Sequence, residues 1–277
     1  MGLKFNDKIN EECDNILIVD GLNLAFRYKH SGQKDFAASY RSTILSLATS
    51  YNAGKIILLG DWGSVWRKEI DPEYKANRTK MKEEQTQQEA DDFKDFLEEL
   101  EVAFELMDTD AMIFKLKGVE ADDIAAYMVK HIPKDKYEHI WLISSDKDWD
   151  LLVSDKVSRF SYVTRKEITS SNWGEHYPYD VDTHISVKVL QGDKGDNVRG
   201  IAGVGEKRAV QILESFGPTA FDVYASLPLP GKQKFIENTN AFGDRFLVNY
   251  ELMDLMTYCD DAVLDHKDKL NEYIEGL

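Results

Sequence analysis

The chain has 277 residues, of which 43% are hydrophobic and 30% are charged, a composition typical of a globular protein with one or two domains. Acidic residues outnumber basic ones by 50 to 34, and the formal net charge of −16 argues against a protein that coats nucleic acid nonspecifically. That charge does not exclude an enzyme whose clustered carboxylates are neutralised by metal ions. Cys13 and Cys259 are too few for a disulfide framework, and they have no neighbours at zinc-ligand spacing.

Nothing in the sequence indicates a membrane-spanning or secreted protein. No apolar run approaches the ~18–20 residues that a helix needs to cross a bilayer. The opening segment Met1–Glu12 is polar and lacks the apolar stretch of a signal peptide. Gly2 could begin a myristoylation signal, but such a signal has Ser or Thr at position 6, where this chain has Asn6. We therefore expect a cytoplasmic protein.

Short apolar runs alternate with longer amphipathic segments over the first 180 residues. The runs have the length and β-branching of buried strands, and the segments between them have the pattern of helices. Strands are predicted at 15–19, 55–59, 112–116 and 140–143, and helices at 36–51, 83–104 and 119–131. This alternation favours right-handed crossovers and a central, mostly parallel sheet that binds ligands at the carboxyl ends of its strands. We expect an α/β domain over residues 1–180.

The strand pattern fades after about residue 180. Helices separated by Gly-rich turns are predicted at 182–191, 206–216, 218–226 and 242–253. We therefore expect a second, smaller helical domain over residues 181–277.

Seven acidic residues follow predicted strands or begin a predicted helix: Asp20, Asp61, Glu120, Asp122, Asp123, Asp146 and Asp148. Taken singly, each of them is compatible with a turn or a helix cap. Taken together they are expected at one edge of the sheet, where two carboxylates ~4 Å apart repel by about 4 kcal/mol at an effective dielectric of about 20. Cations would relieve this repulsion, and oxygen ligands without His or Cys favour Mg²⁺ or Mn²⁺. Two such ions are typical of phosphodiester cleavage.

Two further acids, Asp193 and Asp196, lie three residues apart in the segment 191–197. On its own this spacing is more typical of a turn than of a ligand pair.

The segment 199–209 has the pattern of a helix-hairpin-helix, in which a Gly-x-Gly turn links two helices. Gly203 and Gly205 let backbone N–H groups approach a phosphate, and Lys207 and Arg208 add positive charge beside the turn. Such a hairpin binds the nucleic-acid backbone without reading sequence. A glycine-rich link between packed helices is the alternative.

A basic segment at 67–82 carries six basic and three acidic side chains in this acidic chain. Within it Tyr74 could stack on a base, while Lys75 and Arg78 meet phosphates. A solvated polar loop is the alternative interpretation. The following stretch 83–101 is strongly acidic and is expected to be a solvated helix face.

In combination and order these motifs resemble the 5′-nuclease superfamily, and they are most similar to the flap endonucleases (5′–3′ exonucleases) of T-odd bacteriophages. The resemblance runs from Asp20 to about Cys259. Its motifs are Ile-Val-Asp-Gly, Leu-Gly-Asp, Glu-Tyr-Lys-x-Asn-Arg, Val-Glu-Ala-Asp-Asp, Ser-x-Asp-x-Asp-Trp-Asp, Gly-Asp-x-Gly-Asp-Asn and Gly-x-Gly-x-Lys-Arg.

The resemblance implies a PIN-like α/β domain, a helical arch at about 67–100 that passes a single-stranded 5′ end, and a helical region with a helix-hairpin-helix at about 199–216. It implies a first metal position at Asp20, Asp61, Glu120 and Asp122, a second at Asp148, Asp193 and Asp196, and Asp123 and Asp146 between the two. It also implies that Lys75 contacts the scissile phosphate with help from Arg78, that Tyr74 is a stacking platform, and that Gly203, Gly205, Lys207 and Arg208 hold duplex phosphates, with K⁺ often bound at the hairpin.

The expected function is that of a structure-specific 5′ nuclease, both flap endonuclease and 5′–3′ exonuclease, that hydrolyses DNA with two or more Mg²⁺ or Mn²⁺ ions. We expect a monomer acting in phage DNA replication in the host cytoplasm. Three alternatives remain. A phosphohydrolase with an aspartyl nucleophile needs a second Asp where this chain has Leu22. A DNA-structure binder without catalysis would keep the acids as structural remnants, and a small PIN-type ribonuclease would lack the hairpin and the arch.

Overall fold

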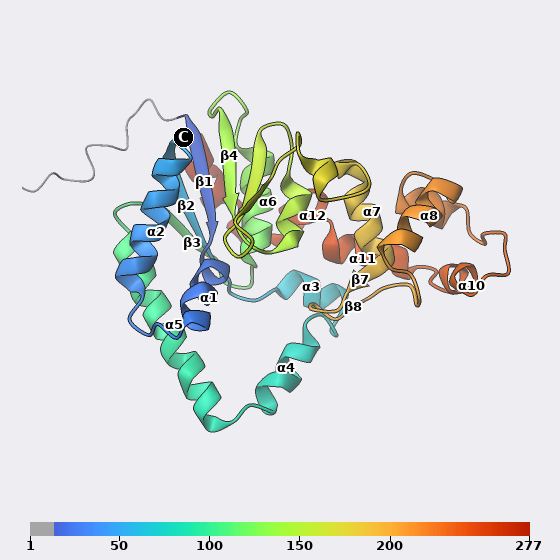
Figure 1. The fold of residues 1–277 in the computed structure, drawn as a ribbon, viewed down its shortest axis with the longest axis horizontal. Helices are drawn as coiled ribbons and strands as arrows, with labels where there is room; N and C mark the ends of the chain where they lie inside the picture. The colour runs from blue at the N-terminus through green and yellow to red at the C-terminus, as the bar shows by residue number, and fades with distance from the viewer. Residues whose placement is uncertain (1–13) are drawn as a thin grey trace, which may run out of the picture. The chain divides into compact units, whose positions relative to one another are not determined.

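The computed structural model describes residues 14–277, which form two compact units (Figure 1). Unit 1 contains the residues up to Ser64 together with Gln85–Ser171 and Cys259–Leu277. Unit 2 contains Val65–Glu84 and Asn172–Tyr258. Each unit therefore consists of segments that are far apart in the sequence.

Unit 1 is built on a six-stranded sheet with the strand order β3-β2-β1-β4-β5-β6. Its strands are β1 (Asn15–Asp20), β2 (Ala53–Gly60), β3 (Met112–Lys115), β4 (His139–Ile143), β5 (Val157–Ser161) and β6 (Lys166–Ile168). The first five strands are parallel and β6 is antiparallel to β5. The expected mostly parallel α/β fold is thus confirmed. Strands β5 and β6 were not predicted, because β5 carries the polar side chains Ser158, Arg159 and Ser161, all of them buried.

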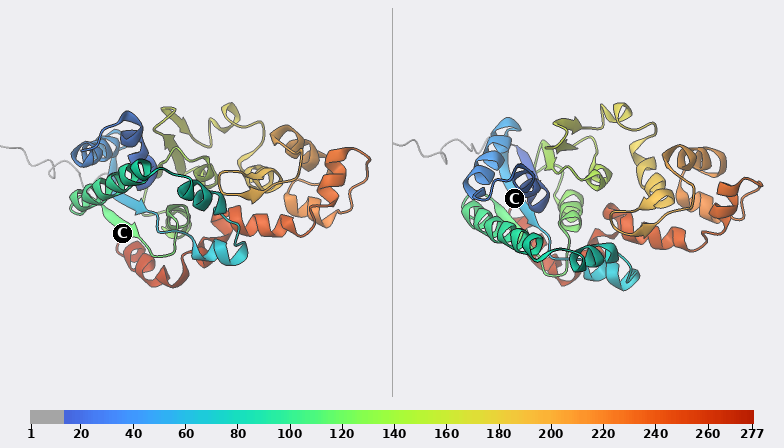
Figure 2. Two further views of the ribbon diagram at one scale, coloured as in Figure 1. Left: turned by 90° about the horizontal axis from the view of Figure 1, so that it is seen from below. Right: turned by 60° about the horizontal axis from the view of Figure 1, so that its bottom comes forward.

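Helices cover both faces of this sheet. The helical segments of unit 1 are α1 (Gly21–Ser31), α2 (Ala37–Ser50), α5 (Gln87–Met107), α6 (Ala121–His131), α13 (Lys267–Glu275) and the 3-10 turns η2 (Lys147–Leu152) and η4 (Leu264–His266). Helices α1, α2 and α5 pack on the face formed by Leu17, Val19 and Leu58, and Figure 2 shows α2 and α5 side by side. Helix α6 contacts β1 and β2, and α13 packs against α6.

The segment expected to form an arch contains a break between two helices. Helix α4 (Ala76–Glu83) ends before residue 84, and α5 begins after Thr86. The Thr86 hydroxyl accepts the Glu89 N–H, while the Glu89 carboxylate accepts the Thr86 N–H, so these residues form a reciprocal capping box. This cap explains why α5 starts at Gln87 rather than at the predicted residue 83.

Unit 2 is mainly helical, and residues 181–258 within it have the helical character that was expected. It contains α3 (Val65–Ile70), α4, the 3-10 turn η3 (Trp173–Glu175), α7 (Val181–Gln191), the short hairpin of β7 (Gly192–Asp193) and β8 (Val198–Arg199), α8 (Glu206–Phe216), α9 (Ala220–Ala225), α10 (Lys234–Asn240) and α11 (Arg245–Met253). Its core includes Leu190, Ile212 and Phe246. Helix α12 (Leu255–Ala262) contains the boundary with unit 1.

The units differ from the expected division at residue 180 in three segments: residues 172–180 belong to unit 2, and so do residues 65–84, whereas residues 259–277 belong to unit 1. Residues 65–84 belong to unit 2, where Tyr74 packs with Val198, Leu252 and Met253. Residues 259–277 belong to unit 1, where the Tyr273 ring meets the edge of Phe114 at a centroid distance of 5.4 Å. Residues 65–84 and 259–277 are thus assigned to their units by contacts with residues that are distant in the sequence.

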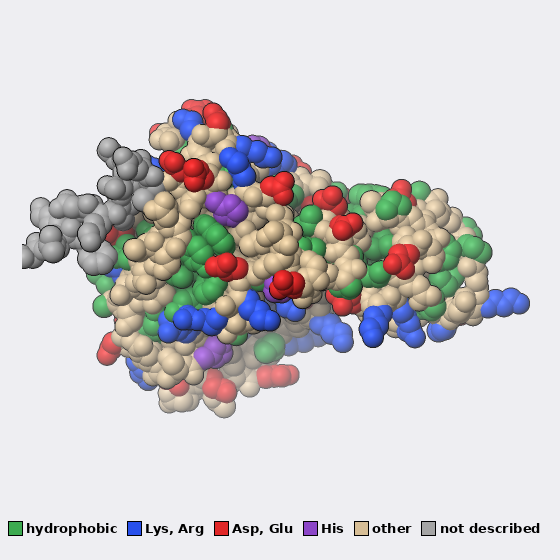
Figure 3. Space-filling view, turned by 45° about the horizontal axis from the view of Figure 1, so that its top comes forward, with side chains coloured by type: hydrophobic (Ala, Val, Ile, Leu, Met, Phe, Trp, Pro, Cys, Tyr) green, Lys and Arg blue, Asp and Glu red, His purple; other side chains and the backbone are tan. Residues whose placement is uncertain are grey.

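Charged side chains of both signs are interspersed over the face drawn in Figure 3, so the net negative charge is not spread as one uniform field there. Within residues 14–277, no helix combines the length and apolar character that a membrane span requires. Cys259 is buried, and burial raises the pKa of its thiol to about 11, which keeps the thiol protonated and unreactive at neutral pH. Cys13 and Met1–Glu12 lie outside the described residues.

Candidate functional site

Asp20 lies at the carboxyl end of β1 and is only 5% exposed. As the N-cap of α1 it accepts the Asn23 N–H through Oδ1, and its Oδ2 accepts the Ser144 hydroxyl at 2.8 Å. Burial, followed by the negative charges of Asp61 and Asp146, raises the pKa of the Asp20 carboxyl to about 8. The local environment therefore disfavours the Asp20 anion unless a proton or a cation neutralises it.

Asp61 follows β2 and fixes the start of α6. Its Oδ1 accepts the Ala121 N–H at 2.9 Å, in the first turn of the helix. Glu120 is the N-cap residue of α6, and Asp122 and Asp123 lie in its first turn. Glu120 and Asp123 are buried. Acidic side chains at a helix N-terminus are favoured by the helix dipole, which accounts locally for this grouping.

Asp146 and Asp148 follow β4, the strand on the other side of β1. The Asp146 N–H donates to the Ser144 hydroxyl at 3.1 Å. Asp146 is also the N-cap of η2, where its Oδ1 accepts the Asp148 N–H at 2.9 Å. The strand ends of β1 and β4 are thus linked through the Ser144 side chain, which donates to Asp20 and accepts from Asp146.

Seven of the nine predicted metal ligands belong to unit 1, and they follow its parallel strands or begin α6. The charges of Asp61 and Asp146 act on Asp20. Among residues 14–277, however, no three His, Cys, Asp or Glu side chains are drawn together closely enough to form a preformed metal-ligand set. Hard oxygen donors around a buried, charge-disfavoured Asp20 fit a divalent cation of the Mg²⁺ class.

The two remaining predicted ligands, Asp193 and Asp196, belong to unit 2 on the β7–β8 hairpin. Asp193 Oδ1 accepts the backbone N–H groups of Gly195 and Asp196, which closes the turn. Lys188 Nζ lies 3.8 Å from Asp193 Oδ2. Asp193 thus has a structural role in the hairpin in addition to any ligand role.

Asp196 is the acceptor for the predicted phosphate-binding residues. Arg78 Nη2 lies 2.7 Å from Asp196 Oδ1, and Lys75 Nζ lies 3.5 Å from Asp196 Oδ2. The Tyr74 hydroxyl donates to the same Oδ2 at 2.9 Å, and the Lys75 backbone N–H donates to the Asp196 carbonyl at 2.8 Å. Lys75 adopts a left-handed conformation with φ of 55°, which is uncommon outside glycine. These contacts fix the direction of both basic side chains.

Tyr74 is not placed as a stacking platform in this structure. The residue is 4% exposed, and it packs in a cluster with Val198, Leu252 and Met253. A ring whose faces are buried does not offer a surface to a base. The part of Tyr74 that meets the predicted site is its hydroxyl, through Asp196.

The predicted helix-hairpin-helix is longer than expected from the sequence. Residues 199–205 contain no helix, so the first helix of the hairpin is α7, which ends at Gln191 and packs against α8. Gly203 has φ of 79°, where a side chain is strained, and Gly205 is the N-cap of α8. Lys207 and Arg208 are exposed in the first turn of α8, and Arg208 donates to the Gly203 carbonyl. A cavity of about 700 Å³ lies along the 191–205 segment.

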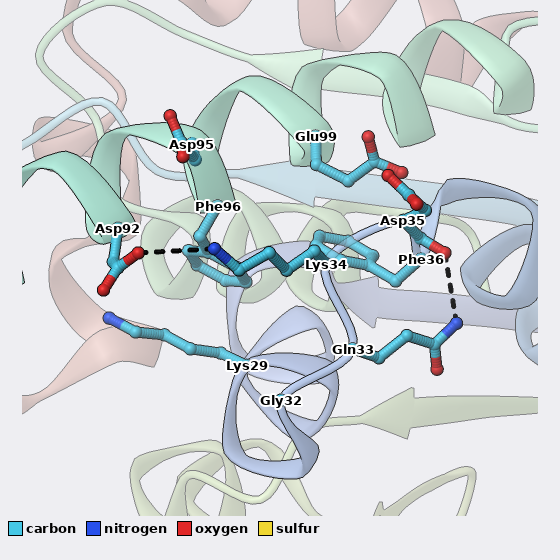
Figure 4. A pocket seen from close by; sticks show the side chains of 10 residues that line it. All are labelled: Lys29, Gly32, Gln33, Lys34, Asp35, Phe36, Asp92, Asp95, Phe96 and Glu99. Carbon is cyan, nitrogen blue, oxygen red and sulfur yellow. Dashed lines mark hydrogen bonds and ion pairs between the residues drawn. The ribbon is translucent and has the colours of Figure 1, made fainter.

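A separate cavity of about 500 Å³ lies between the α1–α2 connection and α5 (Figure 4). Its charged lining joins Lys29 and Lys34 with Asp92 and three other acids, and Lys34 Nζ lies 3.5 Å from Asp92 Oδ1. None of the residues predicted for catalysis, metal binding or DNA binding lines this cavity. Its mixed charge distinguishes it from the acidic strand ends.

Two residues of the site were given no role by sequence reasoning. Ser144 connects Asp20 with Asp146, and Trp149 donates its indole N–H to Asp122 Oδ1 at 2.6 Å. Both belong to the Ser-x-Asp-x-Asp-Trp-Asp motif, so their position beside the acids was visible in the sequence. Their contacts reach other strands and helices, and nothing in the local pattern indicated those partners.

Comparison with known proteins places these observations in a family. Residues 15–178 match the family model for the 5′-3′ exonuclease N-terminal resolvase-like domain. The chain is 50% identical over 252 residues to the flap endonuclease of Escherichia phage T5, which covers 90% of this chain and 86% of that one. It is 28% identical over 222 residues to a 5′-3′ exonuclease of Mycoplasmopsis pulmonis, covering 76% of this chain and 69% of that one.

Solved structures agree with this match. A crystal structure of the phage T5 D15 flap endonuclease in a pseudo-enzyme-product complex with DNA and metal ions covers 95% of this chain and 98% of its own, with 48% identity and a TM-score of 0.89. The catalytic core of Rad2 with a DNA substrate gives a TM-score of 0.55 at 12% identity, which shows a shared fold. The chain therefore belongs to the 5′–3′ exonuclease family, together with the flap endonucleases that it resembles throughout its length.

Proposed function

We propose that this protein is a structure-specific 5′ nuclease, acting as flap endonuclease and 5′–3′ exonuclease on DNA. The observation that carries the proposal is the buried Asp20 carboxylate beside the charges of Asp61 and Asp146, at the carboxyl ends of parallel strands. Family membership supplies the reaction class, and the phage T5 relative supplies the comparison with a DNA- and metal-bound protein.

Divalent cations, Mg²⁺ or Mn²⁺, would supply charge neutralisation and activation of water for phosphodiester hydrolysis. In this proposal Asp20, Asp61, Glu120 and Asp122 hold one ion, Asp148 is a ligand of a second ion, and Asp123 and Asp146 are shared between the two positions. Asp193 and Asp196 remain proposed ligands of the second ion. Their hydrogen bonds and ion pairs within unit 2 give each of them a competing structural role.

Lys75 and Arg78 are the proposed contacts to the scissile phosphate. Lys75 is 16% exposed and directed by its ion pair with Asp196, while Arg78 is 57% exposed and reaches solvent. A lysine positioned in this way orients the phosphate and stabilises the negative charge that develops on it. Products are expected to carry a 5′ phosphate.

Gly203, Gly205, Lys207 and Arg208 are proposed to hold the phosphates of the DNA duplex. The exposed N-terminus of α8 presents backbone N–H groups and two cations, which is a suitable arrangement for an anion. A K⁺ ion at this turn is a further part of the proposal. We also propose that the protein acts as a monomer in phage DNA replication, in the cytoplasm of the infected host.

The alternative phosphohydrolase is disfavoured by Leu22. An aspartyl-nucleophile enzyme needs a carboxylate two residues after the first, whereas Leu22 packs as a partly buried side chain against the core of unit 1. A DNA-binding protein without catalysis is a further alternative, and a cleavage assay distinguishes it from a nuclease.

The deciding experiment compares three DNA substrates with and without Mg²⁺: a 5′-flap duplex, a single strand, and a flap whose 5′ end is blocked. We expect cleavage of the flap near its junction, reduced cleavage when the end is blocked, and none in EDTA. Asp146→Asn should lose activity, while Asp155→Asn, at an exposed turn, should not. Wild-type turnover by Asp146→Asn in Mg²⁺ would contradict the metal assignment.

A further inference from the structure

A buried ion pair lies behind the acidic strand ends of unit 1. Arg159 on β5 and Asp150 in η2 form two contacts, Nε to Oδ1 at 2.5 Å and Nη2 to Oδ2 at 2.9 Å. Their side chains are 4% and 1% exposed. The pair therefore joins η2 to a neighbouring strand of the sheet in a fixed, bidentate geometry.

The third donor of Arg159 extends this connection to the proposed metal ligands. Its Nη1 donates to the Ser144 carbonyl at 2.9 Å. The Ser144 hydroxyl in turn donates to Asp20 and accepts the Asp146 N–H. One guanidinium thus holds both the η2 turn and the residue through which the acids of β1 and β4 are linked.

Trp149 makes the corresponding contact on α6. Its side chain is fully buried, and its indole N–H donates to Asp122 Oδ1 at 2.6 Å. Trp149 lies between Asp148 and Asp150 in η2. The six-residue η2 segment therefore contacts α6 through Trp149 and β5 through Asp150.

Stability alone does not account for this arrangement. Removing two charges from water is costly, and replacing a buried ion pair by apolar side chains of similar volume is often neutral or stabilising. A 3-10 segment as short as η2 has little intrinsic rigidity. The contacts of Trp149 with α6 and of Asp150 with β5 restrict the movement of η2, and therefore also of Asp148 in η2 and Asp146 at its N-cap.

We propose that Trp149, Asp150 and Arg159 are positioning residues that keep Asp122, Asp146 and Asp148 in place, so that a divalent cation can draw them together at little cost. The inference rests on the proposed function for the identity of these acids as metal ligands. It adds that the affinity for the cation depends on three side chains that do not touch the cation themselves. Hydrogen-bonded partners behind metal ligands typically change metal affinity by about 10–100-fold when they are removed.

Trp149→Phe is the first test, because it keeps a buried ring and removes the N–H donor. We expect Mn²⁺ binding, measured by calorimetry without DNA, to weaken about 10-fold. The Mn²⁺ concentration for half-maximal flap cleavage should rise by a similar factor, while the rate at saturating Mn²⁺ changes little. Wild-type Mn²⁺ affinity in a folded Trp149→Phe variant would overturn the role of Trp149.

The double variant Arg159→Met with Asp150→Leu is the second test. Because it replaces the whole pair with apolar side chains, it should keep the fold and its melting temperature while Mn²⁺ affinity falls about 10-fold or more. If this variant melts as the wild type does and binds Mn²⁺ with unchanged affinity, the pair is purely structural. If it does not fold, Arg159→Lys decides the question, because Lys cannot keep both the bidentate pair and the contact to Ser144.

A matched control is the pair Arg41–Asp110 of the same unit, in which Nε lies 2.6 Å from Oδ2 and the Asp110 side chain is 2% exposed. Arg41→Met should lower the melting temperature and leave Mn²⁺ affinity unchanged. A wild-type protein that binds Mn²⁺ but cleaves no DNA would refute the proposed function and leave the positioning role standing. A wild-type protein that binds no Mn²⁺ would refute both.

Discussion

At the scale of single residues, the acid best placed to report on metal binding is Asp20. Its pKa is raised from 3.8 to about 8, mainly by burial and then by Asp61 and Asp146. Between these two values the folded protein retains a proton that the unfolded chain releases. The stabilising contribution is therefore complete below about pH 4 and is lost as the pH rises through about 8.

This reasoning predicts that Asp20→Asn raises the stability of the metal-free protein at alkaline pH. In EDTA the wild type should lose melting temperature between about pH 5 and pH 9, and Asp20→Asn should lose less. Thermal melts at both pH values measure the difference, with Asp155→Asn as the exposed control. An equal loss of melting temperature in wild type and Asp20→Asn would contradict the pKa assigned to Asp20.

A second prediction concerns Asp196, whose carboxylate pairs with Lys75 and Arg78. Lys75→Ala should lower the cleavage rate far more than DNA affinity, because the proposed contact is to the reacting phosphate. Asp196→Asn should also lower the rate, since Lys75 is no longer held by a charged partner. The double variant should lose less than the product of the two single losses, as expected for residues that act through one another.

The test is a double-mutant cycle of the wild type, Lys75→Ala, Asp196→Asn and the double variant. For each protein, the single-turnover cleavage rate is measured, and DNA affinity is measured in Ca²⁺. If the rate loss of the double variant equals the product of the two single losses, Asp196 acts independently of Lys75. Asp71→Asn is the control, because the Asp71 carboxylate pairs with Arg245 within the same unit.

At the scale of elements, the sequence predicted those strands whose side chains show a clear local pattern. Continuous apolar runs identified β1, β2 and β4, because strands buried on both faces lack alternation. The capping box at Thr86, which marks the start of α5, is present in the sequence, but the prediction of a helix from residue 83 did not use it. Strand β5 could not be predicted in this way, since its buried Arg159 is acceptable only because Asp150 neutralises it.

In the candidate site, too, features set by the local sequence were predictable and features set by distant partners were not. Acids after strands were predictable, because parallel strands end at one edge of a sheet. The burial of the Tyr74 ring was not, because its partners Val198, Leu252 and Met253 are more than a hundred positions away in the sequence. The contact of Ser144 with Asp20 was hidden for the same reason, and the contact of Trp149 with Asp122 was hidden because it joins two separate elements, η2 and α6.

The turn before α8 gives a prediction at this scale. Gly203→Ala places a side chain at φ of 79°, and Gly205→Ala alters the N-cap of α8. Both should weaken DNA duplex binding and leave Mn²⁺ binding by unit 1 unchanged. Lys207→Ala should reduce the slope of log affinity against log salt by about 1, as expected for one lost phosphate contact. An unchanged salt slope for Lys207→Ala would exclude that contact.

At the scale of the whole molecule, each unit combines segments that are not contiguous in the sequence. The last 19 residues, Cys259–Leu277, belong to unit 1, although the sequence suggested a continuous C-terminal domain. Leu270 in α13 is fully buried, and the Tyr127 hydroxyl of α6 donates to Asn271 at 2.8 Å. Residues that begin α6 are proposed metal ligands, so the end of the chain supports the helix that carries them.

This arrangement predicts that Leu270→Ala destabilises unit 1 selectively, by about 2–5 kcal/mol for a buried leucine. Hydrogen exchange in native conditions should show faster exchange in α6, whose amides lie in unit 1, and unchanged exchange in α8 of unit 2. Glu275→Ala, exposed on the same helix, is the control and should alter neither. If Leu270→Ala instead accelerates exchange in α8 and leaves α6 protected, the C-terminal helix stabilises the helical unit, and a division of the chain near residue 180 describes its folding better.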